Sequence, residues 1–300
     1  MLIFVTQNKN GMKNHIWHII AVLTVGIWGL TFISTKVLIE SGLSPQEIFL
    51  IRFLVAYVGI WFISPHKFFA DNWKDEFWLL AGGITGGSFY FLTENTAIGI
   101  TLVSNVSFIV CTAPLLTTIL ALMIYKKEKA TRWLVAGSLI ALLGVALVVY
   151  NGNFVLRISP LGDLLSLSAA LMWAFYSLII KKITDRYSTV FITRKVFFYG
   201  VLTILPFFVI HPWQFDVERL LRPAILFNLL FLGVLASLIC FVVWNMVLKR
   251  LGTIKASNYI YLNPVFTLAG SVLLLGEHLT PVALSGAVLI LGGVYLAGKK

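Results

Sequence analysis

Apolar runs long enough to cross a lipid bilayer recur along almost the whole chain. A bilayer core about 30 Å thick requires about 20 helical residues to span it. Runs of about that length cover residues 16–39, 46–64, 77–98, 103–125, 132–150, 161–181, 190–210, 224–248, 254–275 and 281–298. Helices are favoured over a β-barrel because these runs are continuous, not short segments of alternating polarity. The sequence therefore predicts an all-α membrane protein with ten transmembrane helices.

Composition supports a lipid environment and argues against a nucleic-acid partner. The chain is 59% apolar and only 12% charged, whereas soluble domains carry about 25% charged residues. Its net charge of +11 does not form a stripe on a polar face, as nucleic-acid binding would require. Cys111 and Cys240 both lie inside apolar runs. We expect them to be core side chains, not a disulfide or a metal pair.

The distribution of basic residues predicts the orientation of the helices. Lys and Arg concentrate in alternate connections, at residues 67–74, 126–132, 181–195, 249–255 and 299–300. Cytoplasmic loops of membrane proteins carry this excess. We therefore place both termini in the cytoplasm, with residues 1–15 as a cytoplasmic segment, and the chain in the inner (plasma) membrane.

The two halves of the chain resemble each other. At a constant offset of 150, residues 79–124 align without a gap with residues 229–274. The matches include Gly83 with Gly233, Phe91 with Phe241, Asn95 with Asn245, Ser107 with Ser257 and Pro114 with Pro264.

Five spans per half is an odd number, so the second half must cross the bilayer in the opposite sense. We predict two inverted five-helix repeats, residues 16–150 and 161–300, joined by a linker at residues 151–160. Inverted repeats allow two packings that open to opposite sides around a site near the midplane. This arrangement predicts a secondary transporter that works by alternating access.

Several motifs occur at matching places in the two halves. They are GIWGLTFISTK in the first span, IRF in the second, and SFIVCTAP…EKAT and SNYIYLNP…EHLT near the end of each half. On these motifs the chain resembles the drug/metabolite transporter superfamily, specifically its EamA-type ten-helix branch. The resemblance implies a central cavity lined mainly by spans one, three, four, six, eight and nine, with spans five and ten peripheral. Many members of this superfamily export amino acids or other small metabolites.

Glu94 is a carboxylate inside the apolar stretch YFLTENTAIG. It lies about 6 Å below the end of its span at 1.5 Å per residue, where an ionised group is costly unless it is paired or hydrated. It either faces the cavity, contacting a substrate amine or carrying a proton, or forms a structural ion pair with Lys36 or Arg52. Lys36 could instead pair with Glu40, and Arg52 offers a planar fork for a substrate carboxylate.

Other polar and aromatic side chains at membrane depth complete the candidate site. Buried amides either bind substrate or join helices, and aromatic rings either form a ligand wall or fill interfaces. The candidate substrate-binding residues are Trp28, Arg52, Glu94, Asn95, Ser107, Trp173, Tyr176, Trp244, Asn245, Asn258, Tyr261 and Asn263. Glu94 and Lys36 form the candidate coupling pair. Pro114 and Pro264 predict helix breaks that act as hinges or as static bends.

Sequence motifs favour a carrier over other membrane functions. The spans contain no HExxH, GxSxG or paired aspartates, and the five histidines fall at span ends or in loops, which disfavours an intramembrane enzyme. No GxxxxGK[ST] motif is present, so transport would use an ion or substrate gradient. We expect an exporter of small metabolites such as amino acids, without a cofactor or metal. A channel and a lipid flippase remain alternatives, and homodimer formation is left open.

Overall fold

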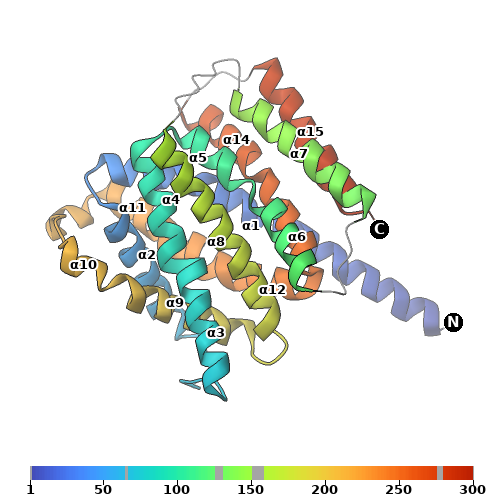
Figure 1. Ribbon diagram of the computed structural model, residues 1–300, viewed down its shortest axis with the longest axis horizontal. Coiled ribbons are helices and arrows are strands. Elements are labelled where there is room, and N and C mark those ends of the chain that lie inside the picture. Colours follow the sequence, from blue (N-terminus) through green and yellow to red (C-terminus); the bar gives the residue numbers. More distant parts are fainter. Residues whose placement is uncertain (1, 65–66, 126–130, 151–158, 276–279, 300) are drawn as a thin grey trace.

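The computed structural model describes residues 2–64, 67–125, 131–150, 159–275 and 280–299, and these residues contain helices and no strand (Figure 1). The helices are α1 (Leu2–Glu40), α2 (Pro45–Ile60), α3 (Trp73–Gly83), η1 (Ile84–Ser88), α4 (Phe89–Ile100), α5 (Val103–Val110), α6 (Ala113–Ile124), α7 (Arg132–Tyr150), α8 (Pro160–Ile183), α9 (Thr189–Ile204), α10 (Phe207–Ile210), η2 (Val217–Leu221), α11 (Pro223–Leu230), η3 (Phe231–Ile239), α12 (Cys240–Leu251), α13 (Thr253–Ser257), η4 (Asn258–Leu262), α14 (Asn263–Leu275) and α15 (Pro281–Ala297).

Helical structure lies in each of the ten predicted apolar ranges. Within the described residues, the stretches long and apolar enough to cross a membrane are His15–Glu40, Asn105–Ile124, Arg132–Tyr150, Pro160–Ile183, Thr189–Ile210 and Pro223–Leu251. One difference concerns the N-terminus, because α1 already begins at Leu2 and residues 2–15 therefore extend the first helix. Most of the predicted linker (residues 151–158) and much of one basic cluster (residues 126–130) lie outside the described residues.

Several spans are interrupted at equivalent places in the two halves. Both η1 and η3 are π-helical, and an offset of 150 places residues 84–88 on residues 234–238, inside η3. A second interruption separates α5 from α6 immediately before Pro114, and its counterpart is the 3₁₀ segment η4 that precedes Pro264. Each proline lies at the start of a new helix, where its missing N–H costs least. The helix breaks predicted at the two prolines are therefore present.

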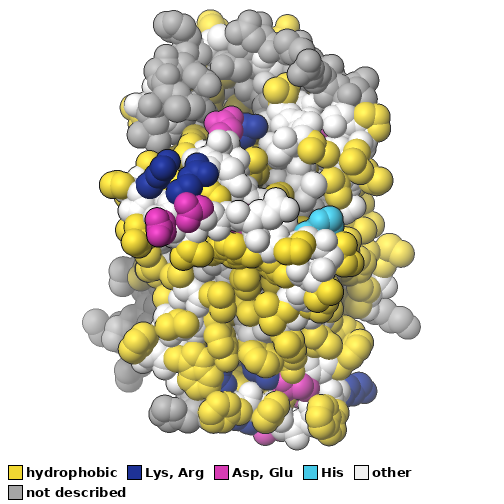
Figure 2. All heavy atoms as spheres, turned by 90° about the vertical axis from the view of Figure 1, so that its left-hand side faces the viewer, with side chains coloured by type: hydrophobic (Ala, Val, Ile, Leu, Met, Phe, Trp, Pro, Cys, Tyr) yellow, Lys and Arg dark blue, Asp and Glu magenta, His cyan; other side chains and the backbone are white. Residues whose placement is uncertain are grey.

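Large apolar side chains cover much of the outer surface. Figure 2 shows a broad band of hydrophobic side chains across one face, between two ends where Lys, Arg, Asp and Glu gather. Exposed members from several helices include Val58, Met123, Phe227 and Leu273. Monomeric soluble proteins rarely expose contiguous apolar patches of this extent, so this surface is suited to contact with lipid.

Aromatic residues from both halves form the centre of the buried core. The Phe53 ring centroid lies 5.4 Å from that of Phe91 and 5.8 Å from that of Phe241. Phe91 and Phe241, which match in the sequence repeat, lie 6.3 Å apart. Cys111 and Cys240 are buried and free, as the sequence predicts. The core therefore joins the two halves directly.

Helices α7 and α15, which occupy the predicted fifth and tenth spans, lie side by side at the edge of the molecule (Figure 1). Glycines bring their backbones together. A Cβ atom on Gly293 would lie 2.5 Å from the backbone nitrogen of Ala141, and one on Gly144 would lie 2.6 Å from the carbonyl oxygen of Gly286. Such close helix packing by small residues is typical of membrane proteins. These two helices are peripheral, as the resemblance implies.

Gly292 and Gly293 provide a matched test of this packing. Gly293→Ala should lower the midpoint of thermal unfolding in detergent by several degrees, because overpacking costs about 1–3 kcal/mol. Gly292→Ala should leave the midpoint unchanged or raise it, since a Cβ there meets no atom within 4 Å. Equal midpoints for the two variants would contradict the packing described for α7 and α15.

Candidate functional site

A central cavity of about 40 Å³ lies between the two halves of the chain. This volume is enough for ordered water and is smaller than the range of about 300–1,000 Å³ that small-molecule sites occupy, so the cavity must widen to admit a substrate. The lining residues are Trp28, Thr31 and Phe32 of α1, Arg52 of α2, Tyr90, Phe91 and Glu94 of α4, Val110 of α5, Ala113 of α6, Trp173 of α8, Phe241 of α12, Ile260 of η4 and Asn263 of α14. Residues of all six spans that the resemblance implies line the cavity. Arg52 adds a residue of the predicted second span.

Aromatic rings from both halves form much of the cavity wall. The ring centroid of Trp173 lies 5.2 Å from that of Trp28, in an edge-to-face arrangement, and 5.2 Å from that of Tyr90. It also lies 5.8 Å from that of Phe241, again edge to face. Edge-to-face pairs are a favoured geometry for aromatic rings. Trp28 is fixed further by its Nε1–H, which donates to the Ala236 carbonyl at 3.0 Å. The wall is therefore ordered and mainly apolar.

Glu94 lies in this wall and is buried, with 6% of its surface exposed. Its Oε1 accepts a hydrogen bond of 2.6 Å from the hydroxyl of Tyr90. Tyr90 precedes Glu94 by four residues on α4, so the two side chains lie on one face of the helix. The second carboxylate oxygen, Oε2, has no hydrogen-bond or ion-pair partner within the described part of the chain. That oxygen remains available to a ligand.

Arg52 brings the opposite charge to the same cavity. Its Nε–H donates to Ser237 Oγ at 3.0 Å, and the guanidinium carbon lies 4.1 Å from the centroid of the Phe91 ring. A cation over an aromatic face is stabilised electrostatically. Considering only described residues, no carboxylate lies within ion-pair distance, and the terminal nitrogens have no hydrogen-bond partner. The cavity therefore holds a basic and an acidic side chain that are not directly bonded to each other.

Two further polar atoms of cavity residues lack partners. Trp173 Nε1 and Asn263 Oδ1 are buried and have no hydrogen-bond partner among the residues that the structure describes. Trp173 and Asn263 are 5% and 6% exposed. Buried polar groups are normally paired, and leaving one unpaired costs about 1–3 kcal/mol. Besides Arg52 and Glu94, the cavity residues thus include one unpaired hydrogen-bond donor, Trp173 Nε1, and one unpaired acceptor, Asn263 Oδ1.

Five of the residues predicted from the sequence line the cavity, namely Trp28, Arg52, Glu94, Trp173 and Asn263. Seven do not, and three of these bind other helices instead. The Tyr176 hydroxyl donates to Asn245 Oδ1 at 2.9 Å, and Asn245 Nδ2 donates to Thr193 Oγ1 at 2.8 Å. Asn95 Nδ2 donates to the Pro45 carbonyl at 3.3 Å. These amides therefore join helices, which is one of the two roles the sequence allows.

The other four candidates outside the cavity lining are Ser107, Trp244, Asn258 and Tyr261, all buried. Trp244 supports the cavity from behind, with its ring centroid 5.1 Å from that of Trp28. The expected pairing of Lys36 with Glu94 is not formed. Lys36 Nζ lies 3.6 Å from Glu40 Oε1, one helical turn away.

Sequence reasoning missed several lining residues, including Tyr90, Phe91 and Phe241. Two signals could have identified them. Tyr90 precedes the conspicuous Glu94 by one helical turn, and Phe91 matches Phe241 across the repeat. Thr31, Val110 and Ile260 carry no comparable signal, because many similar side chains face lipid or core.

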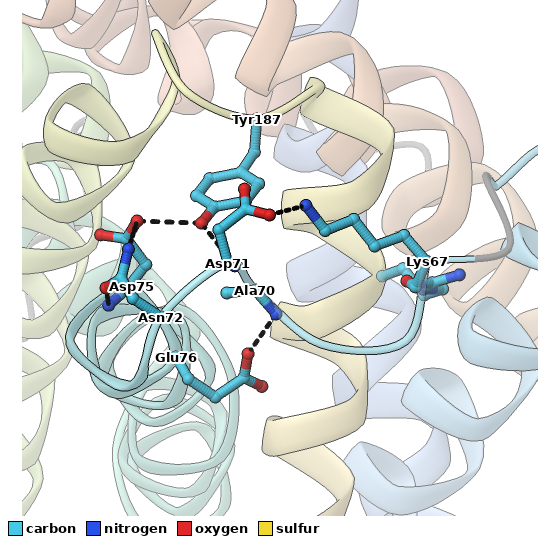
Figure 3. A network of polar contacts seen from close by, with 8 residues as sticks. Lys67, Ala70, Asp71, Asn72, Asp75, Glu76 and Tyr187 are labelled. Atoms are coloured by element: carbon cyan, nitrogen blue, oxygen red, sulfur yellow. Dashed lines mark hydrogen bonds and ion pairs between the residues drawn. The ribbon is translucent and has the colours of Figure 1, made fainter.

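A second polar cluster lies at the start of α3, where it meets the connection between α8 and α9 (Figure 3). The Tyr187 hydroxyl donates to Asp75 Oδ2 at 2.9 Å and accepts from the backbone N–H of Asp71 at 2.9 Å. Arg186 forms an ion pair with Asp75. This cluster joins the first half of the chain to the second at the predicted cytoplasmic end.

The same cluster continues into the protein through Glu76. Lys195 of α9 forms an ion pair with Glu76, and both residues are buried. Glu76 also accepts hydrogen bonds from the Tyr199 hydroxyl and from the backbone N–H of Ala70. The cluster is thus internally paired, unlike the charges of the cavity.

A protein-family model described as the EamA-like transporter family matches residues 15–150 and again residues 160–298. Three relatives have informative names. A "probable amino-acid metabolite efflux pump" of Escherichia coli (strain K12) is 27% identical over 93% of this chain and 93% of its own length. A protein of the same name from Salmonella typhimurium is 29% identical, covering 92% of this chain and 93% of its own. A "probable terminal-alkyne amino-acid exporter" of Streptantibioticus cattleyicolor is 26% identical, covering 93% and 92%.

Among the solved structures that match is a crystal structure with a TM-score of 0.70 and 18% sequence identity. The match covers 95% of this chain and 96% of that chain. The arrangement of helices is therefore one already seen by experiment.

The polar cluster at the start of α3 yields a test of stability. Asp75→Asn should lower the midpoint of thermal unfolding by several degrees, because a buried carboxylate that pairs with Arg186 and Tyr187 is lost, at about 1–3 kcal/mol. Asp71→Asn is the control. Asp71 is exposed and pairs through its side chain with Lys67 at 2.5 Å, an interaction worth about 0–1 kcal/mol. A larger decrease in the unfolding midpoint for Asp71→Asn than for Asp75→Asn would contradict the stabilising role given to Asp75.

Proposed function

This chain belongs to the EamA-like transporter family, and on that premise we propose that it exports small metabolites such as amino acids by alternating access. Membership makes it a multi-pass membrane transporter and not an enzyme. We place it in the inner membrane with both termini in the cytoplasm, because Lys and Arg are concentrated in the connections on that side. Its relatives named as an efflux pump and an exporter support the direction of transport.

The observation that carries the proposal is the central cavity. It is bounded by residues of both halves, it is walled by aromatic rings, and it contains Arg52 and Glu94, which lie within predicted membrane spans. Charged side chains in this position are costly and typically mark a substrate or ion pathway. A cavity shared by two halves can open to either side when the halves move relative to each other.

Alternating access is supported by the correspondence between the two halves. The family model matches each half separately, and the π-helical and proline-associated interruptions recur at an offset of 150. Interrupted helices near a binding site are common in transporters built from inverted repeats. In contrast, α7 and α15 pack closely on each other at the edge, and no described residue of either helix lines the cavity.

In this mechanism Arg52 and Glu94 determine which substrates bind in the cavity. The helices interrupted at η1, η3, η4 and between α5 and α6 rearrange, so that the cavity opens to the other side of the membrane. Substrate binds from the cytoplasm between Arg52 and Glu94, and the two halves then rearrange to expose the cavity to the other side. Energy comes from an ion or substrate gradient. Glu94 is the anionic group that meets either a substrate ammonium group or a coupled proton.

The proposal is tested by counterflow in proteoliposomes. Vesicles loaded with an unlabelled amino acid should accumulate the labelled compound transiently and saturably, with and without a pH gradient. Flux at channel-like rates without saturation would indicate a pore, and exchange of a labelled lipid between leaflets would indicate a flippase. Either result, without counterflow, would overturn the proposal.

Glu94→Gln should fold but lose transport or its dependence on pH, because the amide cannot carry a charge or a proton. Initial rates of counterflow measured from pH 5 to 8 provide the readout. Glu40→Gln is the control, since Glu40 is exposed and pairs, among the described residues, with Lys36, and it should transport like the unmodified chain. Normal transport by Glu94→Gln at every pH would make Glu94 a structural residue.

A further inference from the structure

We propose that a second cavity, separate from the central one, binds a membrane phospholipid that carries an ammonium headgroup. This lateral pocket is formed by residues within 105–109 of α5 and 146–150 of α7 and by Asp163 of α8. Its volume is about 410 Å³, which is within the range of about 300–1,000 Å³ that small-molecule sites occupy. The two cavities share no described lining residue, so the proposal does not depend on what the central cavity transports.

Close packing at the start of α8 places Asp163 beside α5. A Cβ atom on Gly162 would lie 2.9 Å from the Cβ atom of Thr101, which belongs to the connection between α4 and α5. A side chain at position 162 would therefore separate the two elements. The glycine lets the first turn of α8 approach this connection, and the next residue contributes its carboxylate to the pocket.

The carboxylate of Asp163 is not used by the protein itself. Its Oδ1 is buried without a hydrogen-bond partner, and no cation of the described chain lies within ion-pair distance. The cap of α8 is Ser159, whose Oγ accepts from the Gly162 N–H at 3.3 Å. A helix dipole favours an acidic residue in the first turn, but it gives the oxygens no donor. An ammonium group of a ligand supplies both the opposite charge and donors.

The lining of the lateral pocket has the same polarity as a phospholipid. Its polar residues Asn105, Tyr150 and Asp163 lie near the ends of their helices that meet the predicted outer connections. Leu147 and Ile109 line the pocket about 4.5 and 6 Å farther along their helices, at 1.5 Å per residue. A headgroup at the membrane boundary and an acyl chain that points inward match this order.

The neighbouring surface favours a lipid over a water-soluble amine. Leu161 and Leu164, on either side of Asp163 in the sequence, are each 60% exposed, and Leu143 of α7 is 57% exposed. These side chains are suited to contact with acyl chains. A ligand of the lateral pocket therefore comes from the bilayer, and its headgroup reaches a carboxylate.

The lateral pocket adjoins the helix that borders the central cavity. Ile109 lines the lateral pocket, and the next residue, Val110, lines the central cavity. The short helix α5 thus contributes to both walls. A bound lipid would contact α5 immediately before its interruption at Pro114.

The proposal is tested with two phospholipids that share their acyl chains and differ in the headgroup. Phosphatidylethanolamine carries an ammonium group, whereas phosphatidylglycerol is anionic and has none. Native mass spectrometry of the detergent-purified chain, titrated with each lipid, gives their dissociation constants. Phosphatidylethanolamine should bind about tenfold more tightly, as expected for one hydrogen bond to a charged group.

Two variants assign this preference to the lateral pocket. Asp163→Asn should weaken phosphatidylethanolamine about tenfold and abolish its advantage over phosphatidylglycerol. Ala146→Phe should weaken both lipids, because the added ring occupies the pocket that Ala146 lines.

Two control variants should bind both lipids as the unmodified chain does. Glu218→Gln removes an exposed carboxylate of a predicted outer connection, and Leu143→Phe adds a ring to an exposed position of α7 that does not line the pocket. Thermal unfolding in detergent establishes that each variant is folded. The comparison of the two lipids on the unmodified chain needs no variant.

Three results would each overturn the proposal. The first is equal affinity of the unmodified chain for the two lipids. The second is a preference for phosphatidylethanolamine that survives in folded Asp163→Asn or Ala146→Phe. The third is binding of a water-soluble amine, 2-phenylethylamine, that depends on Asp163 and is at least as tight as that of phosphatidylethanolamine, which would make the ligand a soluble cation and not a lipid.

Discussion

The cost of burying charge in a bundle surrounded by lipid is the constraint on which this structure depends. Arg52 and Glu94 lie on α2 and α4, both in the first half, yet Ser237 and Trp173 of the second half complete their surroundings. Ionisable side chains inside a lipid-embedded bundle are tolerated where they face a cavity and have a complementary group nearby. The charges therefore favour a fold in which two halves share one polar compartment.

The remaining helices supply the aromatic lining of this compartment and the π-helical segment that can alter its shape. Aromatic rings from both halves line the cavity, and edge-to-face contacts order them. The π-helical segment η3 supplies both partners that fix the cavity residues, Ser237 for Arg52 and the Ala236 carbonyl for Trp28. Since π-helical turns occur often at functional sites, a change of winding in η3 would move both residues together.

The positions of the helices were largely predictable from the sequence, whereas the direction of individual side chains was not. Run length and prolines located the helical stretches and the breaks before Pro114 and Pro264. Glu94 was recognisable because a carboxylate in an apolar run is rare. Asn245 and Tyr176 were not separable from cavity residues, because a buried amide or hydroxyl satisfies helix packing and ligand binding equally well. Only coordinates show that they bond to each other and to Thr193.

The central claim is that one cavity, shared by both halves, faces each side of the membrane in turn. Cysteine introduced at Thr31, which lines the cavity, in a chain whose own Cys111 and Cys240 are replaced by alanine, reports this directly. A membrane-impermeant thiol reagent should label it from either side, and substrate should slow labelling from both. Labelling from one side only, or from neither, would contradict alternating access.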